Sequence, residues 1–169
     1  MAERGILCED ERLELWEGEI FRMSPIGNAH AASVDGFNGR LTRRLPEDVV
    51  VRIQGPLRLS ARSEVQPDVL ILRPRADRYF ASSVGPEDVL LLIEVSDTTL
   101  RYDRTIKLPR YARAGIREVW IVNLKGKRLF VYRDLVDGKY TTQLVLGPAD
   151  TVAPVEFPDV SIEVAYVLG

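Results

Sequence analysis

Residues 88–96, DVLLLIEVS, constrain the fold more than any other part of the sequence. Five apolar residues, 89–93, lead directly into the carboxylate of Glu94. An unbroken apolar run of this length is typical of a strand that is covered on both faces. An ionised carboxylate in such a strand is costly unless a cation or hydrogen-bond donors meet it. The sequence therefore predicts a buried central strand with a compensated charge at Glu94.

Asp68 repeats this pattern at the mouth of another apolar strand, in QPDVLIL. Pro67 cannot donate to a strand ladder, so we expect the strand to begin near Asp68. Alternation gives each acid neighbours on its own face: Leu70 and Leu72 for Asp68, and Leu90, Leu92 and Ser96 for Glu94. Adjacent strands can therefore place both acids on one side of the sheet. A hard divalent cation such as Mg²⁺ between them would relieve their repulsion.

Both acids also have a purely structural interpretation. Glu94 can form an ion pair with Lys107 or with an arginine, and Asp68 can cap or turn a strand. These alternatives stay open on the residues alone.

The other elements follow from periodicity and turn residues. LELWEGEIFRMS alternates around Glu17-Gly18 and predicts a hairpin. A helix is expected from Asn28 to Leu45, where Pro46 ends it, because apolar residues recur at spacings of three and four. VVVRI, PLRL and VQPDVLIL indicate short strands before residues 88–96.

A second helix is expected in RYDRTIKLPRYARAGI, where Pro109 either kinks the helix or lies in a first turn near Thr105. EVWIVNL, RLFVYRDL and KYTTQLVL then alternate like antiparallel strands. The predicted fold is α/β (α+β): an αβββαβ core whose central mixed β-sheet is flanked by helices, with an N-terminal β-hairpin and extra C-terminal strands. With 169 residues and 46% hydrophobic content, we expect a single domain over residues 1–169.

Composition excludes several classes. The net charge of −2 gives no overall basic excess, so nucleic-acid binding would need a local patch. The sequence contains no run that approaches a membrane span and no signal-peptide pattern, so we expect a cytoplasmic protein without membrane contact. Cys8 is the only cysteine, which excludes an internal disulfide and a multi-cysteine metal cluster.

Three blocks, LELWEGEIFRMSPIGNAH, PDVLIL and IEVSDTTLRYDRTIKLPRYARAGIREVWIVN, resemble the bacterial Uma-type endonuclease family over roughly residues 11 to 133. That family belongs to the PD-(D/E)XK superfamily, whose restriction-endonuclease-like core is αβββαβ. Asp68 matches the Asp of PD, and Glu94 matches the acid of (D/E)XK. Ser96 stands where the superfamily has its lysine, whereas the family carries a lysine in the following helix, here Lys107.

The resemblance implies a Mg²⁺-dependent endonuclease that hydrolyses DNA, with Mn²⁺ as a possible substitute and a homodimer as a possible assembly. Asp68 and Glu94 would hold the metal, and Lys107 would orient the attacking water or stabilise the phosphate. A surface pair between Lys107 and Asp103 is the alternative for that lysine. The alternative function is a catalytically inactive nucleic-acid- or protein-binding module. A two-carboxylate glycosidase ranks last, because 8% aromatics leaves no evident surplus for a sugar cleft.

Weaker candidates lie in the N-terminal part. His30, the sole histidine, begins the first helix and can contact phosphate, transfer a proton or form a structural hydrogen bond. Glu14 is a weaker candidate for an outer metal ligand, although hairpin acids such as Glu14 and Glu17 are usually solvated. The candidate DNA-contacting residues are arginines, each of which can also belong to a solvated face: Arg40, Arg43, Arg44, Arg101 and Arg104.

Overall fold

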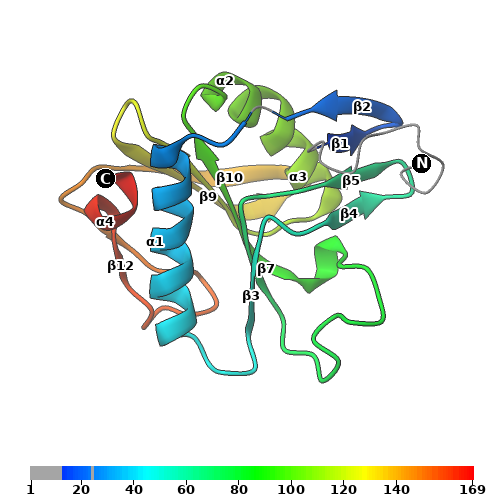
Figure 1. The fold of residues 1–169 in the computed structure, drawn as a ribbon, viewed down its shortest axis with the longest axis horizontal. Coiled ribbons are helices and arrows are strands. Elements are labelled where there is room, and N and C mark those ends of the chain that lie inside the picture. The colour runs from blue at the N-terminus through cyan, green and yellow to red at the C-terminus, as the bar shows by residue number, and fades with distance from the viewer. Residues whose placement is uncertain (1–12, 24) are drawn as a thin grey trace.

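The structure is a computed structural model that describes residues 13–23 and 25–169. Cys8 lies outside these residues. The described strands form a six-stranded sheet in the order β10-β9-β8-β7-β6-β3, a four-stranded sheet in the order β2-β1-β5-β4, and the pair β11-β12 (Figure 1). In the six-stranded sheet only β7 and β8 run parallel, so the sheet is mixed, as the sequence predicts.

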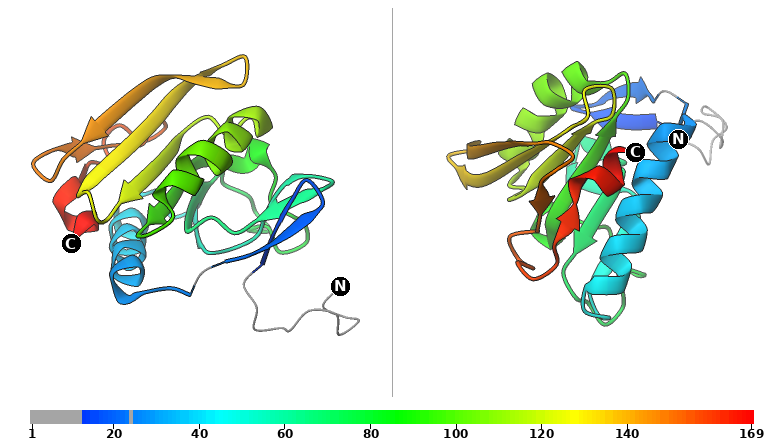
Figure 2. Two further views of the ribbon diagram at one scale, coloured as in Figure 1. Left: turned by 90° about the horizontal axis from the view of Figure 1, so that it is seen from above. Right: turned by 90° about the vertical axis from the view of Figure 1, so that its left-hand side faces the viewer.

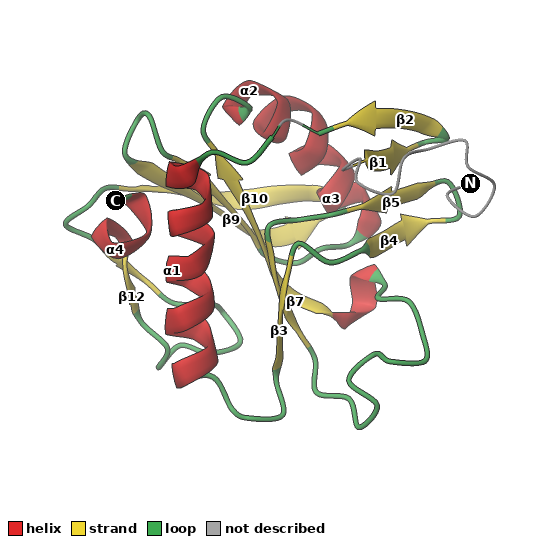
Figure 3. Cartoon of the chain, in the orientation of Figure 1, coloured by secondary structure: helices red, strands yellow, loops and turns green. Residues whose placement is uncertain are grey.

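The helices and strands expected from periodicity are present, but VQPDVLIL spans the end of one strand and the whole of the next, and short elements that were not predicted occur at residues 86–88, 151–152 and 162–168 (Figure 3). The strands are β1 (Leu13–Trp16), β2 (Glu19–Arg22), β3 (Val50–Ile53), β4 (Leu57–Ser60), β5 (Ser63–Val65), β6 (Val69–Leu72), β7 (Val89–Ser96), β8 (Val119–Asn123), β9 (Arg128–Val136), β10 (Lys139–Leu146), β11 (Thr151–Val152) and β12 (Ile162–Glu163). The helical elements are α1 (Asn28–Arg44), the 3₁₀ turn η2 (Pro86–Asp88), α2 (Leu100–Tyr102), the π-helical turn η3 (Asp103–Lys107), α3 (Leu108–Ala114) and α4 (Val164–Leu168). None of these described helices is long and apolar enough to span a membrane.

Strand β7 is the buried centre of the large sheet. All eight of its residues are buried, including Glu94 and Ser96. It pairs with β6 on one side and with β8 on the other, so it has no free edge. The prediction of a central strand that is covered on both faces is confirmed.

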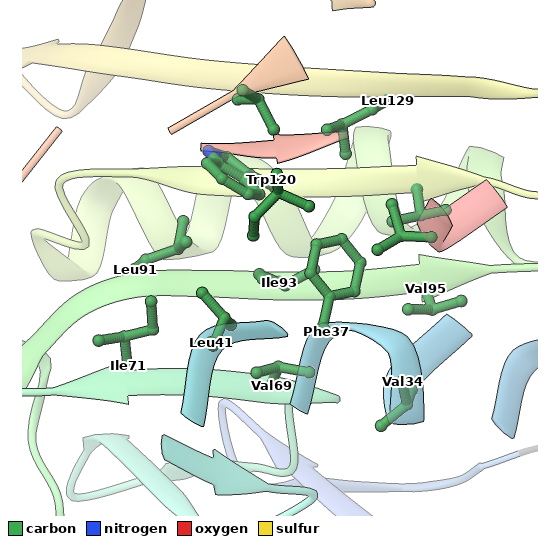
Figure 4. Close-up of a cluster of buried hydrophobic side chains, with 14 of the residues drawn as sticks. Val34, Phe37, Leu41, Val69, Ile71, Leu91, Ile93, Val95, Trp120 and Leu129 are labelled. Atoms are coloured by element: carbon green, nitrogen blue, oxygen red, sulfur yellow. The ribbon is translucent and has the colours of Figure 1, made fainter. Parts of the chain in front are cut away.

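Helices cover the two faces of this sheet differently (Figure 2). On one face, the apolar stripe of α1 packs with α4 against the sheet; Figure 4 shows Phe37 beside Ile93 and near Trp120. On the other face lie α3 and the four-stranded sheet, which contribute the second core cluster: Trp16, Leu57, Val65, Leu108 and Tyr111. Glu94 is on the second face, because its register partner Ile121 belongs to that cluster.

The alternation predicted for β7 is wrong at one residue. Leu90 was expected on the face of Leu92 and Glu94, yet it packs in the core beneath α1. The cause is a bulge: Ile71 pairs with Leu91, whereas the next residue of β6 pairs with Val89. The extra residue shifts only the start of the strand, so the face assigned to Glu94 is unaffected.

The second helix begins earlier than Pro109 alone suggests. It starts at Leu100 and passes through η3, in which the N–H of Leu108 donates to the carbonyl of Asp103. Pro109 then lies in the first turn of α3, where its missing N–H is tolerated. Gly115 ends α3 with φ +91°, a left-handed conformation that favours glycine. The π turn is the feature that carries Asp103 and Lys107 toward the sheet.

Candidate active site

A half-enclosed cavity of about 320 Å³ lies beside the end of β7 at which Ser96 is found. The hairpin, the segment that joins it to α1, the start of α1, and the α2–η3 helix form its walls. Five residues singled out from the sequence line it together: Glu14, His30, Asp68, Glu94 and Lys107. The structure therefore brings together residues that are up to 93 positions apart in the chain.

The two predicted metal-binding acids lie on neighbouring strands. Leu70 pairs with Leu92 and Val69 with Ile93, so the same register places Asp68 opposite Glu94. Asp68 directly precedes β6, as Pro67 predicts, and both acids are buried, with 4% and 3% of their surfaces exposed. The expectation that both carboxylates reach one side of the sheet and one cavity is confirmed.

Asp68 is held by three donors. The backbone N–H of Val95 donates to its Oδ2 (2.8 Å), and the amide of Gln54 donates to its Oδ1 (3.2 Å). His30 Nε2 lies 3.0 Å from Oδ2 and donates to it in the tautomer that carries the proton on Nε2. The other ring nitrogen, Nδ1, is buried without a partner among the described residues. His30 thus contacts an acid of the site directly, and its role in proton transfer stays a prediction.

Lys107 points into the site and not toward solvent. Only 5% of it is exposed, and its Nζ lies 3.1 Å from Oε1 of Glu94 and 3.0 Å from Oε1 of Glu14. A surface pair with Asp103 is therefore wrong, since both residues are buried and the lysine pairs with other acids. Lys107, which comes from the helical segment, thus reaches Glu94 in β7 from the side.

The pKa of Glu94 is strongly perturbed. Burial raises its pKa to about 8; Lys107 opposes that shift, and the nearby carboxylates of Asp68, Asp103 and Glu14 add to it. The hydroxyl of Tyr111 donates to the same Oε1 (2.5 Å), and burial beside Glu94 raises the pKa of this tyrosine. The close lysine thus does not offset the effect of burial on the pKa of Glu94.

Glu14 is buried, although hairpin acids are usually solvated. Its Oε1 accepts from Lys107 and from the backbone N–H of Gln66 (3.2 Å), and its Oε2 accepts from the indole of Trp16 (3.0 Å). The solvated alternative is therefore wrong for Glu14 and correct for Glu17, which is exposed. Glu14 anchors Lys107, and its role as an outer metal ligand stays a prediction.

Comparisons with known proteins identify the family of the chain and a similar fold. The family model Uma2, described as "Putative restriction endonuclease", matches residues 3–165. The chain belongs to the Uma2 family. The crystal structure of a putative nuclease of DUF820 from Anabaena variabilis is similar in fold, with a TM-score of 0.74 and 14% sequence identity over 92% of this chain and 89% of that one. No curated protein shows significant similarity to the chain.

Asp103 also belongs to this site, although the sequence analysis did not include it among the candidate site residues. It is 4% exposed, lines the cavity, and accepts through Oδ2 from Ser96 (2.7 Å) and Thr99 (2.6 Å). Burial raises its pKa, with Lys107 opposing. The signal was present: Asp103 and Lys107 are four residues apart in an expected helix, so they share a face. Ser96 thus fixes a further acid.

The residues of this Uma2 cavity suit a hard divalent cation by chemistry and charge. Its buried charged groups, within the described chain, are four carboxyls and one ammonium: Glu14, Asp68, Glu94, Asp103 and Lys107. Carboxylate oxygens are the ligands that Mg²⁺ prefers, and it commonly takes one or two of them with water. Residues 13–23 and 25–169 contain no group of three or more His, Cys, Asp or Glu side chains that could hold a metal ion together. A metal here would therefore rest on Asp68 and Glu94.

The arginines proposed to contact DNA do not form one patch with the cavity. Arg40 pairs with Glu163 (3.5 Å) and stacks on Tyr166 near the C-terminus, with Arg43 and Arg44 in the last turn of α1. His30, by contrast, is in the first turn of that helix. Arg101 and Arg104 line a separate hollow beside Tyr132. Their binding to nucleic acid stays a prediction.

Proposed function

We propose that this protein is a Mg²⁺-dependent endonuclease that hydrolyses DNA phosphodiester bonds, with Mn²⁺ as an alternative metal. The observation that supports this most directly is the register of β6 and β7, which puts Asp68 opposite Glu94 at a cavity that Lys107 also enters. Membership of the Uma2 family and the fold of the DUF820 nuclease support the same class of activity.

Asp68 and Glu94 would hold the metal, which when bound acidifies a water and neutralises charge on the scissile phosphate. The chain's own groups do the rest. Val95, Gln54 and His30 fix the carboxylate of Asp68 through hydrogen bonds. Lys107 supplies a fixed positive charge in a buried site, where it can orient the attacking water or stabilise the phosphate.

The alternative is a catalytically inactive binding module that keeps the nuclease fold. One observation favours it: the ammonium of Lys107 is already neutralised by Glu94 and Glu14 at 3.1 and 3.0 Å. In that case the buried acids and the lysine form a structural ion-pair cluster, and bound nucleic acid or protein would remain uncut.

A cleavage assay separates the two functions. Purified protein is incubated with supercoiled, linear and single-stranded DNA in Mg²⁺, Mn²⁺ or EDTA. We expect cleavage with either metal, none in EDTA, and a loss of at least about a hundredfold in Asp68→Asn and Glu94→Gln. Asp159→Asn, which removes an exposed acid, is the matched control. Binding without cleavage under all conditions would favour the inactive module.

A further inference from the structure

We infer that the cavity receives an unpaired DNA strand, with one base lying against an aromatic wall formed by Phe21 and Tyr102. This inference rests on the proposed nuclease function and adds the form of the substrate to it. The wall faces the same cavity as the two acids, but it belongs to different elements, β2 and α2.

The wall is apolar although it adjoins a cluster of charged groups. The rings of Phe21 and Tyr102 lie 6.5 Å apart at a tilt of 43°, and Met23 and Ile26 continue the lining toward the mouth. Ile26 is 40% exposed, so apolar surface reaches the solvent at the entrance. Metal binding and water activation do not need such a surface. Stacking of a nucleobase does, because every base presents an apolar face to an aromatic ring.

The depth of the acids argues against an intact duplex. Asp68 and Glu94 are 4% and 3% exposed, and they line the same cavity as Pro25, Ile26 and Gly27. A scissile phosphate must reach both acids, whereas a phosphate of duplex DNA is flanked by paired bases and by the opposite strand. A single strand can bend its phosphate into the cavity and turn its base toward the wall. The entrance thus suits one strand.

The hydroxyl of Tyr102 supplies an independent observation. It is buried, yet it has no hydrogen-bond partner among the described residues. Buried polar groups are nearly always paired, so an orphan hydroxyl at a cavity calls for an explanation. A phosphate or sugar oxygen of a bound strand would supply the missing acceptor if the side chain of Tyr102 rotates its hydroxyl into the cavity that it lines. Tyr102 would then combine ring stacking with one hydrogen bond.

The test compares one labelled oligonucleotide as a single strand, a blunt duplex and a forked duplex with unpaired arms. Cleavage is measured with Mg²⁺ and Mn²⁺ as kcat and KM, and binding is measured by fluorescence anisotropy with Ca²⁺ and with EDTA. The variants are Phe21→Leu and Tyr102→Phe. Their matched controls are Phe80→Leu, which changes a phenylalanine that is 97% exposed, and Tyr166→Phe, which changes a half-exposed tyrosine. Thermal melts establish that each variant is folded.

We expect the single strand and the fork to be cut with at least about tenfold higher kcat/KM than the blunt duplex. Phe21→Leu should raise KM for the single strand about tenfold and leave the duplex nearly unchanged, and Tyr102→Phe should lose severalfold on the single strand. Equal cleavage of single strand and duplex, or equal losses on both in Phe21→Leu, would overturn the inference.

Failure of the nuclease function gives a different result. If no form of DNA is cut with either metal, the proposed activity is wrong, and binding then decides the inference. Preferential binding of the single strand that Phe21→Leu abolishes and Phe80→Leu preserves supports the aromatic wall. Equal binding of single strand and duplex by the intact protein overturns it.

Discussion

The Nζ of Lys107 lies 3.1 Å from Oε1 of Glu94, and the π turn sets this contact between a helix and the central strand. The same ammonium also pairs with Glu14, so one cation serves two buried carboxylates. Burial lowers the pKa of Lys107, but Glu94, Glu14 and Asp103 outweigh burial and raise it overall. The lysine therefore stays charged at neutral pH, and the acids share its charge.

Replacing Lys107 by methionine should destabilise the protein strongly. The change keeps the apolar stem but leaves the carboxylate of Glu14 buried without its cation and removes a hydrogen-bond partner of Glu94, a situation that costs about 3 to 5 kcal/mol. Urea unfolding at pH 7 measures the loss. Lys125→Met, at an exposed turn, is the control and should change the free energy of unfolding by less than about 0.5 kcal/mol. A similarly small effect of Lys107→Met would mean that the pair contributes nothing to folding.

The raised pKa of Glu94 predicts how stability depends on pH. The native state keeps a proton up to about pH 8, whereas the unfolded chain releases it near 4.5, so folding loses stability as pH rises between these values. Glu94→Gln removes this titration and can still accept from Tyr111. In EDTA, the free energy of unfolding of wild type should therefore fall relative to that of Glu94→Gln as the pH rises from 5 to 8. At pH 8 the variant should be at least as stable as wild type.

Urea midpoints of both proteins across this range check the prediction. Glu156→Gln, which changes an exposed acid, supplies the matched comparison and should follow wild type. Parallel curves for wild type and Glu94→Gln would contradict the raised pKa. A marked loss of stability in Glu94→Gln at pH 8 would instead mean that Glu94 serves chiefly as a structural partner of Lys107.

Metal should stabilise the native state through Asp68 and Glu94. A ligand that binds only the folded protein adds about 2.7 kcal/mol at a hundred times its dissociation constant. We expect excess Mg²⁺ or Mn²⁺ to raise the thermal midpoint of wild type, but not that of Asp68→Asn or Glu94→Gln. Asp159→Asn should respond like wild type, because its carboxylate is exposed. Identical melts of wild type in EDTA and in metal would remove the support for this cation site.

Sequence reasoning reached the parts of the site that periodicity controls. The apolar run of β7 indicates burial on both faces, and its alternation places Glu94 on the face of Leu92. Pro67 sets the start of β6 at the residue after Asp68. These features depend only on residues that are close in the sequence. The position of Asp68 opposite Glu94 then follows from the alternation along each strand and from the register of β6 against β7.

The residues that surround the acids depend on contacts distant in sequence, which periodicity cannot supply. The buried residues of β1 are Glu14 and Trp16, although hairpin acids such as Glu14 are usually solvated. Glu14 is buried because it meets Lys107, 93 positions later. Likewise, the residues of the π turn do not themselves predict its conformation, which directs Lys107 toward the sheet. The only local indication is Pro109, which follows the turn.

Glu118 is a second buried acid, and it does not line the cavity. It can therefore be compared with Glu94 to separate a structural role of a buried acid from a role in the candidate active site. It is 2% exposed, and its oxygens accept from Arg133 (2.7 Å), Trp120 (2.7 Å) and the backbone N–H of Val155 (2.8 Å). Trp120 packs beneath α1, on the face of the sheet opposite to Glu94. Both oxygens of Glu118 accept hydrogen bonds. Glu94 differs, because its two donors, Lys107 and Tyr111, both contact Oε1 and its pKa is raised.

Arg133→Met should therefore lower the free energy of unfolding by about 3 kcal/mol, because it leaves a buried carboxylate without its cation. DNA cleavage should be unchanged at temperatures where the variant remains folded, since Arg133 does not line the cavity. Arg117→Met, at an exposed arginine, is the control for both measurements. Lys107→Met should instead lose both stability and cleavage. If Arg133→Met abolished cleavage while remaining fully stable, the two buried acids would not be functionally separate, and the assignment of catalysis to the face of Glu94 would be wrong.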